Sequence, residues 1–122
     1  MVKDLMVALE HKPGTLAEMG KVLGDAGINI EGICAVTYRG EGGVHILVND
    51  AAAAEKALSA KGIQVMSERD VLVLDIKDKP GELGKKADAL AAAGINIEMV
   101  YLATGTRLVL GVDDLEKAKG VL

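Results

Sequence analysis

The sequence predicts an α+β protein made of two βαββαβ modules in tandem, with antiparallel sheets and the helices on one face of each. Three observations support this prediction: a repeated segment, alternating apolar residues typical of strands, and apolar spacing typical of helices. The only prolines, Pro13 and Pro80, lie 67 residues apart in the same phrase, Lys-Pro-Gly. At this offset 11 of the 20 residues from Lys12 to Glu31 are identical to their partners. Unrelated segments would share about one or two, so the chain contains an internal duplication.

The first module is expected at residues 1–68 and the second at residues 69–122. In the first, Leu5, Val7 and Leu9 occupy alternate positions, which predicts a strand whose apolar face carries these three residues. A helix is expected from about Thr15 to Ala26, because Leu16, Met19, Leu23 and Ala26 recur at helical spacing and would form its buried face. The other expected elements are strands at 28–38, 44–49 and 63–68 and a helix at 51–60.

The ends of the first helix carry their own signals. Thr15 and Glu18 have the spacing of a capping box, in which the threonine hydroxyl caps the helix N-terminus. Gly27 is placed to end the helix in the left-handed conformation. In the second module Gly94 occupies the same position, and Glu82 replaces Thr15.

The second module is expected to lack its last strand. Its predicted elements are strands at 71–76, 95–103 and 107–112, a helix at 80–93 and a helix from Asp113, and the sequence ends at Leu122. The strand at 71–76 would then have an unpaired edge, which native proteins normally cover. Either another protomer or segment covers this edge, or the last strand has been removed by truncation.

The outer face of the first sheet is expected to be apolar. If Leu5, Val7 and Leu9 face the helices, the residues facing away are Met6, Ala8, Ile33, Ala35, Leu47 and Met66. A sheet face in water would instead be polar. The sequence therefore predicts that this face packs against another surface, and a homodimer is expected.

Composition excludes several classes of protein. The net charge is −4, and the longest basic cluster is Lys85-Lys86, so no nucleic-acid partner is expected. No apolar run is long enough to cross a bilayer and no signal peptide is visible, which predicts no membrane partner. The single cysteine, Cys34, excludes an internal disulfide and favours a cytoplasmic location.

Catalytic and metal chemistry are also not expected. His11, His45 and Cys34 lie in different elements, without the spacing of a catalytic triad or of a metal site. The glycine-rich run at 40–43 closes a hairpin rather than opening a helix, so it is not a phosphate-binding loop. The sequence therefore predicts a protein that is not an enzyme and has no cofactor and no bound metal.

The repeated phrase resembles the signature of the ACT domain family, regulatory modules of amino-acid metabolism. That signature is a strand, a Lys/Arg-Pro-Gly-x-Leu turn, and a helix that ends in Gly-Ile/Val-Asn-Ile/Val. It occurs here as 12–16 with 27–30, and again as 79–83 with 94–97. The resemblance covers essentially the whole chain and implies a ferredoxin-like fold that binds a small amino-acid effector at an interface between modules.

The resemblance also implies which residues contact the ligand. In related domains these are the first strand-to-helix turn and the Asn that opens the second strand. In this sequence the expected ligand-binding residues are His11, Lys12, Pro13, Gly14, Thr15, Leu16 and Asn29, with Asp78, Lys79, Pro80, Gly81, Glu82, Leu83 and Asn96 in the second copy. Because His11 and Asp78 stand where many members have an amide or another polar residue, the two sites are expected to differ.

The residue types suit a zwitterion. Backbone N–H groups at a helix N-terminus bind a carboxylate, and Gly14 allows the backbone to approach a ligand closely. Asn29 offers both donors and an acceptor, and Asp78 is able to pair with an ammonium group. The alternative is that Pro-Gly forms only a turn and that the asparagine satisfies its own backbone.

The sequence thus predicts a stand-alone regulatory module that binds a free amino acid and signals to a metabolic enzyme in trans. The alternatives are a ligand-free protein-interaction module, or a regulatory subunit of an amino-acid biosynthetic enzyme. A metal sensor on the same fold is disfavoured for lack of ligands.

Overall fold

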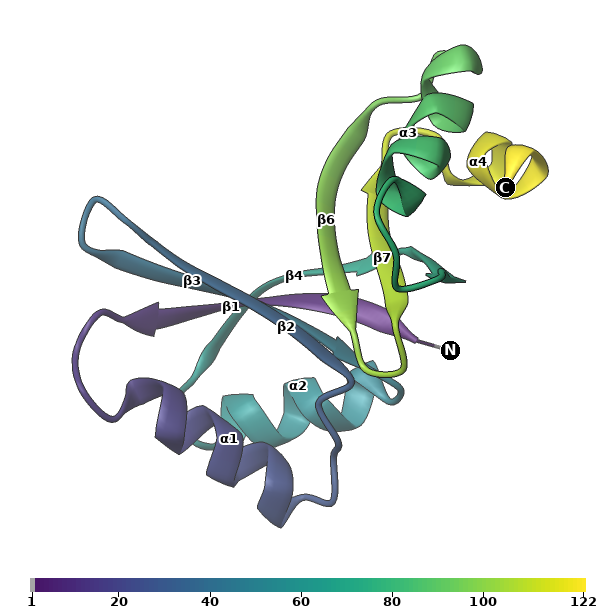
Figure 1. Ribbon diagram of the computed structural model, residues 1–122. Helices are drawn as coiled ribbons and strands as arrows, with labels where there is room; N and C mark the ends of the chain where they lie inside the picture. The colour runs from purple at the N-terminus through teal and green to yellow at the C-terminus, as the bar shows by residue number, and fades with distance from the viewer. Residues whose placement is uncertain (1) are drawn as a thin grey trace. The chain divides into compact units, whose positions relative to one another are not determined.

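The computed structural model describes residues 2–122 (Figure 1). They fall into two compact units, Met1–Arg69 and Asp70–Leu122, each with one copy of the repeat. A module boundary after residue 68 stays a prediction. Among the residues described, no helix has the length and apolar character needed to cross a bilayer.

The first unit has the predicted order of elements, βαββαβ. These are β1 (Lys3–Glu10), α1 (Thr15–Asp25), β2 (Gly32–Tyr38), β3 (Glu41–Val48), α2 (Ala51–Ala60) and β4 (Gln64–Asp70). The strands lie in the order β4-β1-β3-β2, and β3 is antiparallel to both of its neighbours. The helical connection from β1 to β2 therefore passes over β3.

Both helices of the first unit cover the same face of its sheet (Figure 1). Leu5 and Val7 of β1 are fully buried beneath them, as predicted, and Leu9 is partly buried at the margin. The core is aliphatic, since the sequence contains no Phe or Trp. Each apolar Å² removed from water contributes about 25 cal/mol, so close packing of many small side chains provides the stability. The core residues contributed by the other elements are Met19, Leu23, Val44, Ile46, Val48, Ala51, Ala54, Leu58 and Ile63.

The prediction for two residues of the outer sheet face is wrong. The register places Ile33 opposite Ile46 and Ala35 opposite Val44. Directly opposed residues on neighbouring strands share a face, so Ile33 and Ala35 lie on the helix side. The residues of β2 that face away from the helices are Cys34, Val36 and Tyr38, together with Met6 and Ala8 of β1. The outer face is still rich in apolar residues, and Val36 and Tyr38 are well exposed.

The second unit has three strands and two helices. These are β5 (Leu72–Asp75), α3 (Glu82–Ala92), β6 (Ile97–Ala103), β7 (Arg107–Val112) and α4 (Leu115–Val121). Its strands follow the order β6-β7-β5, and both pairs are antiparallel. Leu90 of α3 and Ala118 of α4 pack with Leu108 and Leu110 of β7 in one core, so both helices lie on the same sheet face. The predicted fold class, tandem ferredoxin-like modules with a shortened second copy, is confirmed.

The start of α1 differs from the prediction. Its N-cap is Gly14, with a left-handed φ of +95°, and no side chain caps the helix. The predicted capping box of Thr15 and Glu18 is therefore wrong. At the other end the prediction is confirmed, because Gly27 adopts a left-handed φ of +74°.

Candidate ligand-binding site

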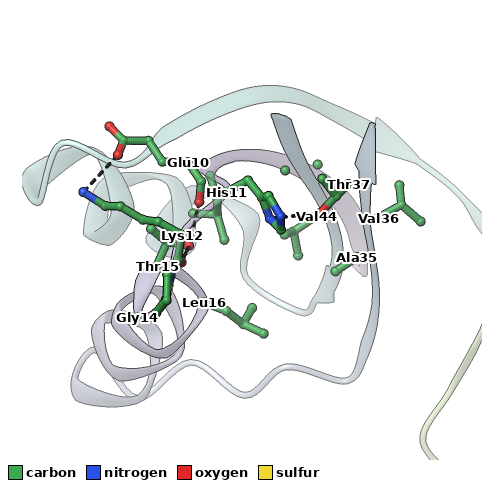
Figure 2. Close-up of a pocket in the computed structure, with 14 residues that line it drawn as sticks. Glu10, His11, Lys12, Gly14, Thr15, Leu16, Ala35, Val36, Thr37 and Val44 are labelled. Carbon is green, nitrogen blue, oxygen red and sulfur yellow. Dashed lines mark hydrogen bonds and ion pairs between the residues drawn. The ribbon is translucent and has the colours of Figure 1, made fainter. Parts of the chain in front are cut away.

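A cavity of about 350 Å³ opens at the β1–α1 turn of the first unit. Figure 2 shows the turn on one side and the ends of β2 and β3 on the other. Its volume falls within the range of small-molecule sites, about 300–1,000 Å³. The residues that line it are Leu9, Glu10, His11, Lys12, Pro13, Gly14, Thr15, Leu16, Ala35, Val36, Thr37, Gly42, Gly43 and Val44.

The floor of the cavity is the end of the sheet, on its helix side. There Leu9 pairs with Gly42, and Gly42 pairs with Thr37 on the next strand. A Cβ atom at Gly42 would lie only 2.8 Å from the backbone oxygen of Leu9. Because Gly42 has no side chain, β1 and β3 approach closely here and the space above them stays open.

The wall of the cavity is the turn from His11 to Leu16. The hydroxyl of Thr15 donates to the backbone oxygens of Glu10, at 2.8 Å, and of Lys12, at 3.2 Å. These bonds tie the end of β1 to the start of α1. Since Gly14 caps the helix without a side chain, the first N–H groups of α1 are left with no side-chain acceptor. The turn therefore presents a helix N-terminus beside the cavity.

The polar side chains that line the cavity already have partners. The Lys12 amine lies 3.0 Å from a Glu10 carboxylate oxygen. The His11 ring nitrogen Nδ1 and the Thr37 hydroxyl are 3.3 Å apart and share a hydrogen bond (Figure 2). The remaining walls are aliphatic side chains of β1, β2, β3 and α1. The cavity is thus largely apolar, with polar groups that are paired within the unit.

The structure brings together six of the seven residues expected in the first copy. His11, Lys12, Pro13, Gly14, Thr15 and Leu16 all line the cavity. The expected burial of Leu16 and Ala26 is wrong, because Leu16 is half exposed at the cavity and Ala26 is exposed at the end of α1, whereas Met19 and Leu23 are buried as predicted. Asn29 is exposed after the C-terminal end of α1, the opposite end of the helix, and does not line the cavity. Its role as a ligand contact stays a prediction.

In the second copy, Glu82 occupies the position of Thr15 and changes the turn. The residue is only 9% exposed, and its carboxylate lies 3.5 Å from the Lys79 amine and 3.6 Å from the Lys85 amine. Burial by itself raises the pKa of Glu82. The opposite charges of Lys85 and Lys79 lower the pKa by more than burial raises it, so it lies below the ordinary value. A carboxylate of the chain itself therefore lies in the first turn of α3.

A larger residue also replaces a small residue of the cavity floor in the second unit. The registers of the two hairpins place Leu102, on the helix side, where the first unit has Ala35. On the outer face they place Arg107 where the first unit has Gly43, and the Arg107 guanidinium donates to the backbone and side-chain oxygens of Thr104, at 2.8 and 3.0 Å. Leu102 therefore lies at the sheet end that is open in the first unit.

Asn96 has a structural role in the second unit. Its backbone N–H and its side-chain amide both donate to the Asp113 carboxylate, each at 3.1 Å. The Asp113 N–H in turn donates to the Asn96 backbone oxygen at 3.2 Å. This set of bonds joins the start of β6 to the end of β7. Asp78, Lys79, Pro80, Gly81 and Leu83 lie in or next to the β5–α3 turn, and their role as ligand contacts stays a prediction.

The sequence analysis missed the contribution of the hairpin to this site. Ala35, Thr37, Gly42 and Val44 line the cavity although they lie about 20 to 30 residues after the turn. The glycine-rich run at 40–43 was a signal, but it was interpreted only as a turn. A partly buried pair was also missed: the buried Asp4 carboxylate lies 2.9 Å from Nδ1 of His45, on the face away from the helices. Within residues 2–122, no group of three or more His, Cys, Asp or Glu side chains is arranged to hold a metal ion.

Comparison with known proteins agrees with this architecture. Residues 1–122 match the family described as an ACT domain pair. The chain belongs to this family. As an ACT domain pair it is a regulatory module rather than a catalytic one. A comparison with curated proteins gives no match.

Solved structures resemble the ACT domain pair over its whole length. A protein from Bacteroides thetaiotaomicron is 32% identical, with a TM-score of 0.89 over 100% of this chain and 87% of that one. The ligand-free regulatory subunit of aspartate kinase from Thermus thermophilus is 21% identical, with a TM-score of 0.73 over 99% of this chain and 87% of its own. The same subunit from Thermus flavus is 19% identical, with a TM-score of 0.72 over 98% and 86%. At these identities the Thermus proteins show a shared fold.

Proposed function

We propose that this ACT domain pair binds a free amino acid at the β1–α1 turn of its first unit and regulates a metabolic enzyme in trans. The observation that carries the proposal is the 350 Å³ cavity, because six residues expected from the family signature line it. The ligand carboxylate would accept bonds from N–H groups at the start of α1, where the helix dipole favours negative charge. The likeness to regulatory subunits of aspartate kinase supports a regulatory role.

The second unit would act as a scaffold. Glu82 already places a carboxylate in the first turn of α3, and Leu102 replaces Ala35 on the floor. An added anion would compete with Glu82 for Lys79 and Lys85. The free Cys34 suits the reducing cytoplasm, where we expect the protein to act.

Ligand binding is tested by thermal shift with each of the twenty amino acids, with and without divalent metal ions. A ligand at 100 times its dissociation constant adds about 2.7 kcal/mol to the free energy of unfolding. A shift with one amino acid that needs no metal supports the proposal. If no amino acid at millimolar concentration moves the transition, the chain is a ligand-free interaction module or regulatory subunit. A shift with metal alone would instead favour a metal sensor.

Two matched glycine variants identify the unit that binds. Gly14 and Gly81 are the left-handed N-caps of α1 and α3, and a Cβ atom at either meets no other atom within 4 Å. Gly14→Ala and Gly81→Ala should each lower the free energy of unfolding by about 1–2 kcal/mol, through backbone strain alone. Only Gly14→Ala should also weaken amino-acid binding. Weaker binding in Gly81→Ala alone would move the site to the second unit.

We also propose that the protein is a homodimer that uses the outer sheet face of the first unit. Val36 and Tyr38 on this face are 63% and 70% exposed, and Met66 of β4 is 55% exposed. They line a broad depression of about 810 Å³ together with Met6 and Ala8. Apolar surface of this kind is typical of interfaces. The chain has a mass of 12.7 kDa, and light scattering at micromolar concentration should give twice this mass. A monomer would contradict the proposal.

A further inference from the structure

We infer that the first-unit cavity selects an amino acid with an uncharged aliphatic side chain, the class of valine, leucine and isoleucine. The inference rests on the proposed function, since it concerns the ligand of the same cavity. Three features of the lining support it: its aliphatic walls, the pairing of its polar groups, and the small residue at position 35.

The walls that would surround a ligand side chain are aliphatic and come from separate elements. Leu9 lies on β1, Leu16 on the first turn of α1, Ala35 on β2 and Val44 on β3. Leu16 is 50% exposed, whereas Val44 is almost fully buried. A ligand that covers Leu16 removes apolar surface from water on both partners, which favours an apolar side chain.

The polar lining offers little to a charged or hydrogen-bonding side chain. Glu10 and Lys12 neutralise each other across 3.0 Å. Thr15 donates to two backbone oxygens of the turn, and His11 and Thr37 bond to each other. A polar ligand side chain would have to break one of these bonds or remain unpaired. A hydrogen bond to the chain would therefore gain little over one to water, so such ligands should bind more weakly.

Ala35 sets the space available on the floor. It lies on the helix side of β2, next to Val44, whereas the second unit has Leu102 at this place, next to Leu108. In Figure 2 the side chain of Ala35 lies on the same side of β2 as Val44, and that of Val36 lies on the opposite side. A side chain three carbons larger would occupy the space that a leucine or valine ligand needs. Ala35 is therefore a specificity-determining residue for the length of the ligand side chain.

Calorimetry on the full chain with each of the twenty amino acids tests this selectivity, and the main comparison is leucine, isoleucine and valine against asparagine, aspartate, lysine and threonine. One of the three aliphatic amino acids should bind at least tenfold more tightly than any of the polar four, because a single methylene group in an apolar pocket changes affinity by a factor of about 10–200. Tighter binding of a polar, charged or aromatic amino acid overturns the inference and leaves the proposed function intact. If none of the twenty amino acids binds, both fail.

The variant Ala35→Leu tests the role of the cavity floor. It should weaken leucine binding at least tenfold and alanine binding much less, so that the ratio of the two dissociation constants changes. A general loss of structure would weaken both equally, which separates a specificity role from a structural one. The control is Leu102→Ala, which exchanges the same residue types in reverse at the equivalent place and should leave both constants unchanged. An unchanged ratio in Ala35→Leu overturns the assignment.

Discussion

The hydroxyl of Thr15 donates to the backbone oxygen of Glu10 across 2.8 Å, which joins the first residue of α1 to the last residue of β1. The bond closes the turn from within, and the ligand cavity lies beside it. In the second unit the same position holds Glu82, whose carboxylate pairs with lysines instead. One substitution between the repeats thus replaces a hydroxyl at the first residue of the helix by a carboxylate.

Thr15→Val should lower the free energy of unfolding by about 1 kcal/mol. The variant keeps the shape of the side chain but removes the hydroxyl that bonds to Glu10 and Lys12, and a typical hydrogen bond contributes about 0.5–1.5 kcal/mol. Urea unfolding measures the change. Thr15→Ser keeps the hydroxyl and serves as the control. A Thr15→Val protein as stable as the wild type would show that these bonds add nothing.

Gly42→Ala should destabilise the first unit by about 1–3 kcal/mol, the usual cost of forcing extra atoms into a closely packed place. Its Cβ atom would lie 2.8 Å from the backbone oxygen of Leu9, and backbone is unable to move aside cheaply. Gly43→Ala is the matched control. There the nearest atom is the end of the flexible Met6 side chain, 3.5 Å away. Equal denaturation midpoints for the two variants would contradict the close approach of β1 and β3.

Stability should depend on pH through Glu82. The folded state lowers the pKa of this carboxyl below its ordinary value of 4.5, so the ionised form stabilises the fold. That contribution is complete above pH 4.5 and is lost as the pH falls through the lowered pKa. Wild type and Glu82→Gln should therefore differ in unfolding midpoint near neutral pH and converge in acid. A difference that grows as the pH falls would mean that the pKa is raised instead.

Asn96→Ala should lower the free energy of unfolding by about 1 kcal/mol, because it removes the amide bond to Asp113. Both asparagines are exposed, but within residues 2–122 Asn29 has no side-chain bond like the one from Asn96 to Asp113, so the matched variant Asn29→Ala should change stability little. Ligand titrations on both proteins then separate structure from binding. Weaker amino-acid binding in Asn29→Ala, at unchanged stability, would support the ligand role that the family resemblance implies. A larger loss of stability in Asn29→Ala than in Asn96→Ala would contradict the structural assignment.

The sequence by itself determined the duplication, the order of elements and the turn that bounds the cavity. These are local properties: Pro13, Gly14 and Gly27 act on the backbone next to them, and Leu5 and Val7 mark one face of a strand by alternation. The equivalence of the two repeats also follows from sequence alone, because identical phrases recur at a fixed offset.

Only the tertiary structure decided which residues from distant segments meet at the turn. Which residues of β2 face the helices depends on the register of β2 against β3, and alternation within one strand leaves that register open. Ile33 and Ala35 therefore lie on the helix side rather than on the outer face. Likewise the Thr15 hydroxyl turns back to Glu10 instead of capping α1, because Gly14 takes the N-cap in the left-handed conformation. The cavity exists because β3 presents Gly42 there, and that juxtaposition is a product of packing.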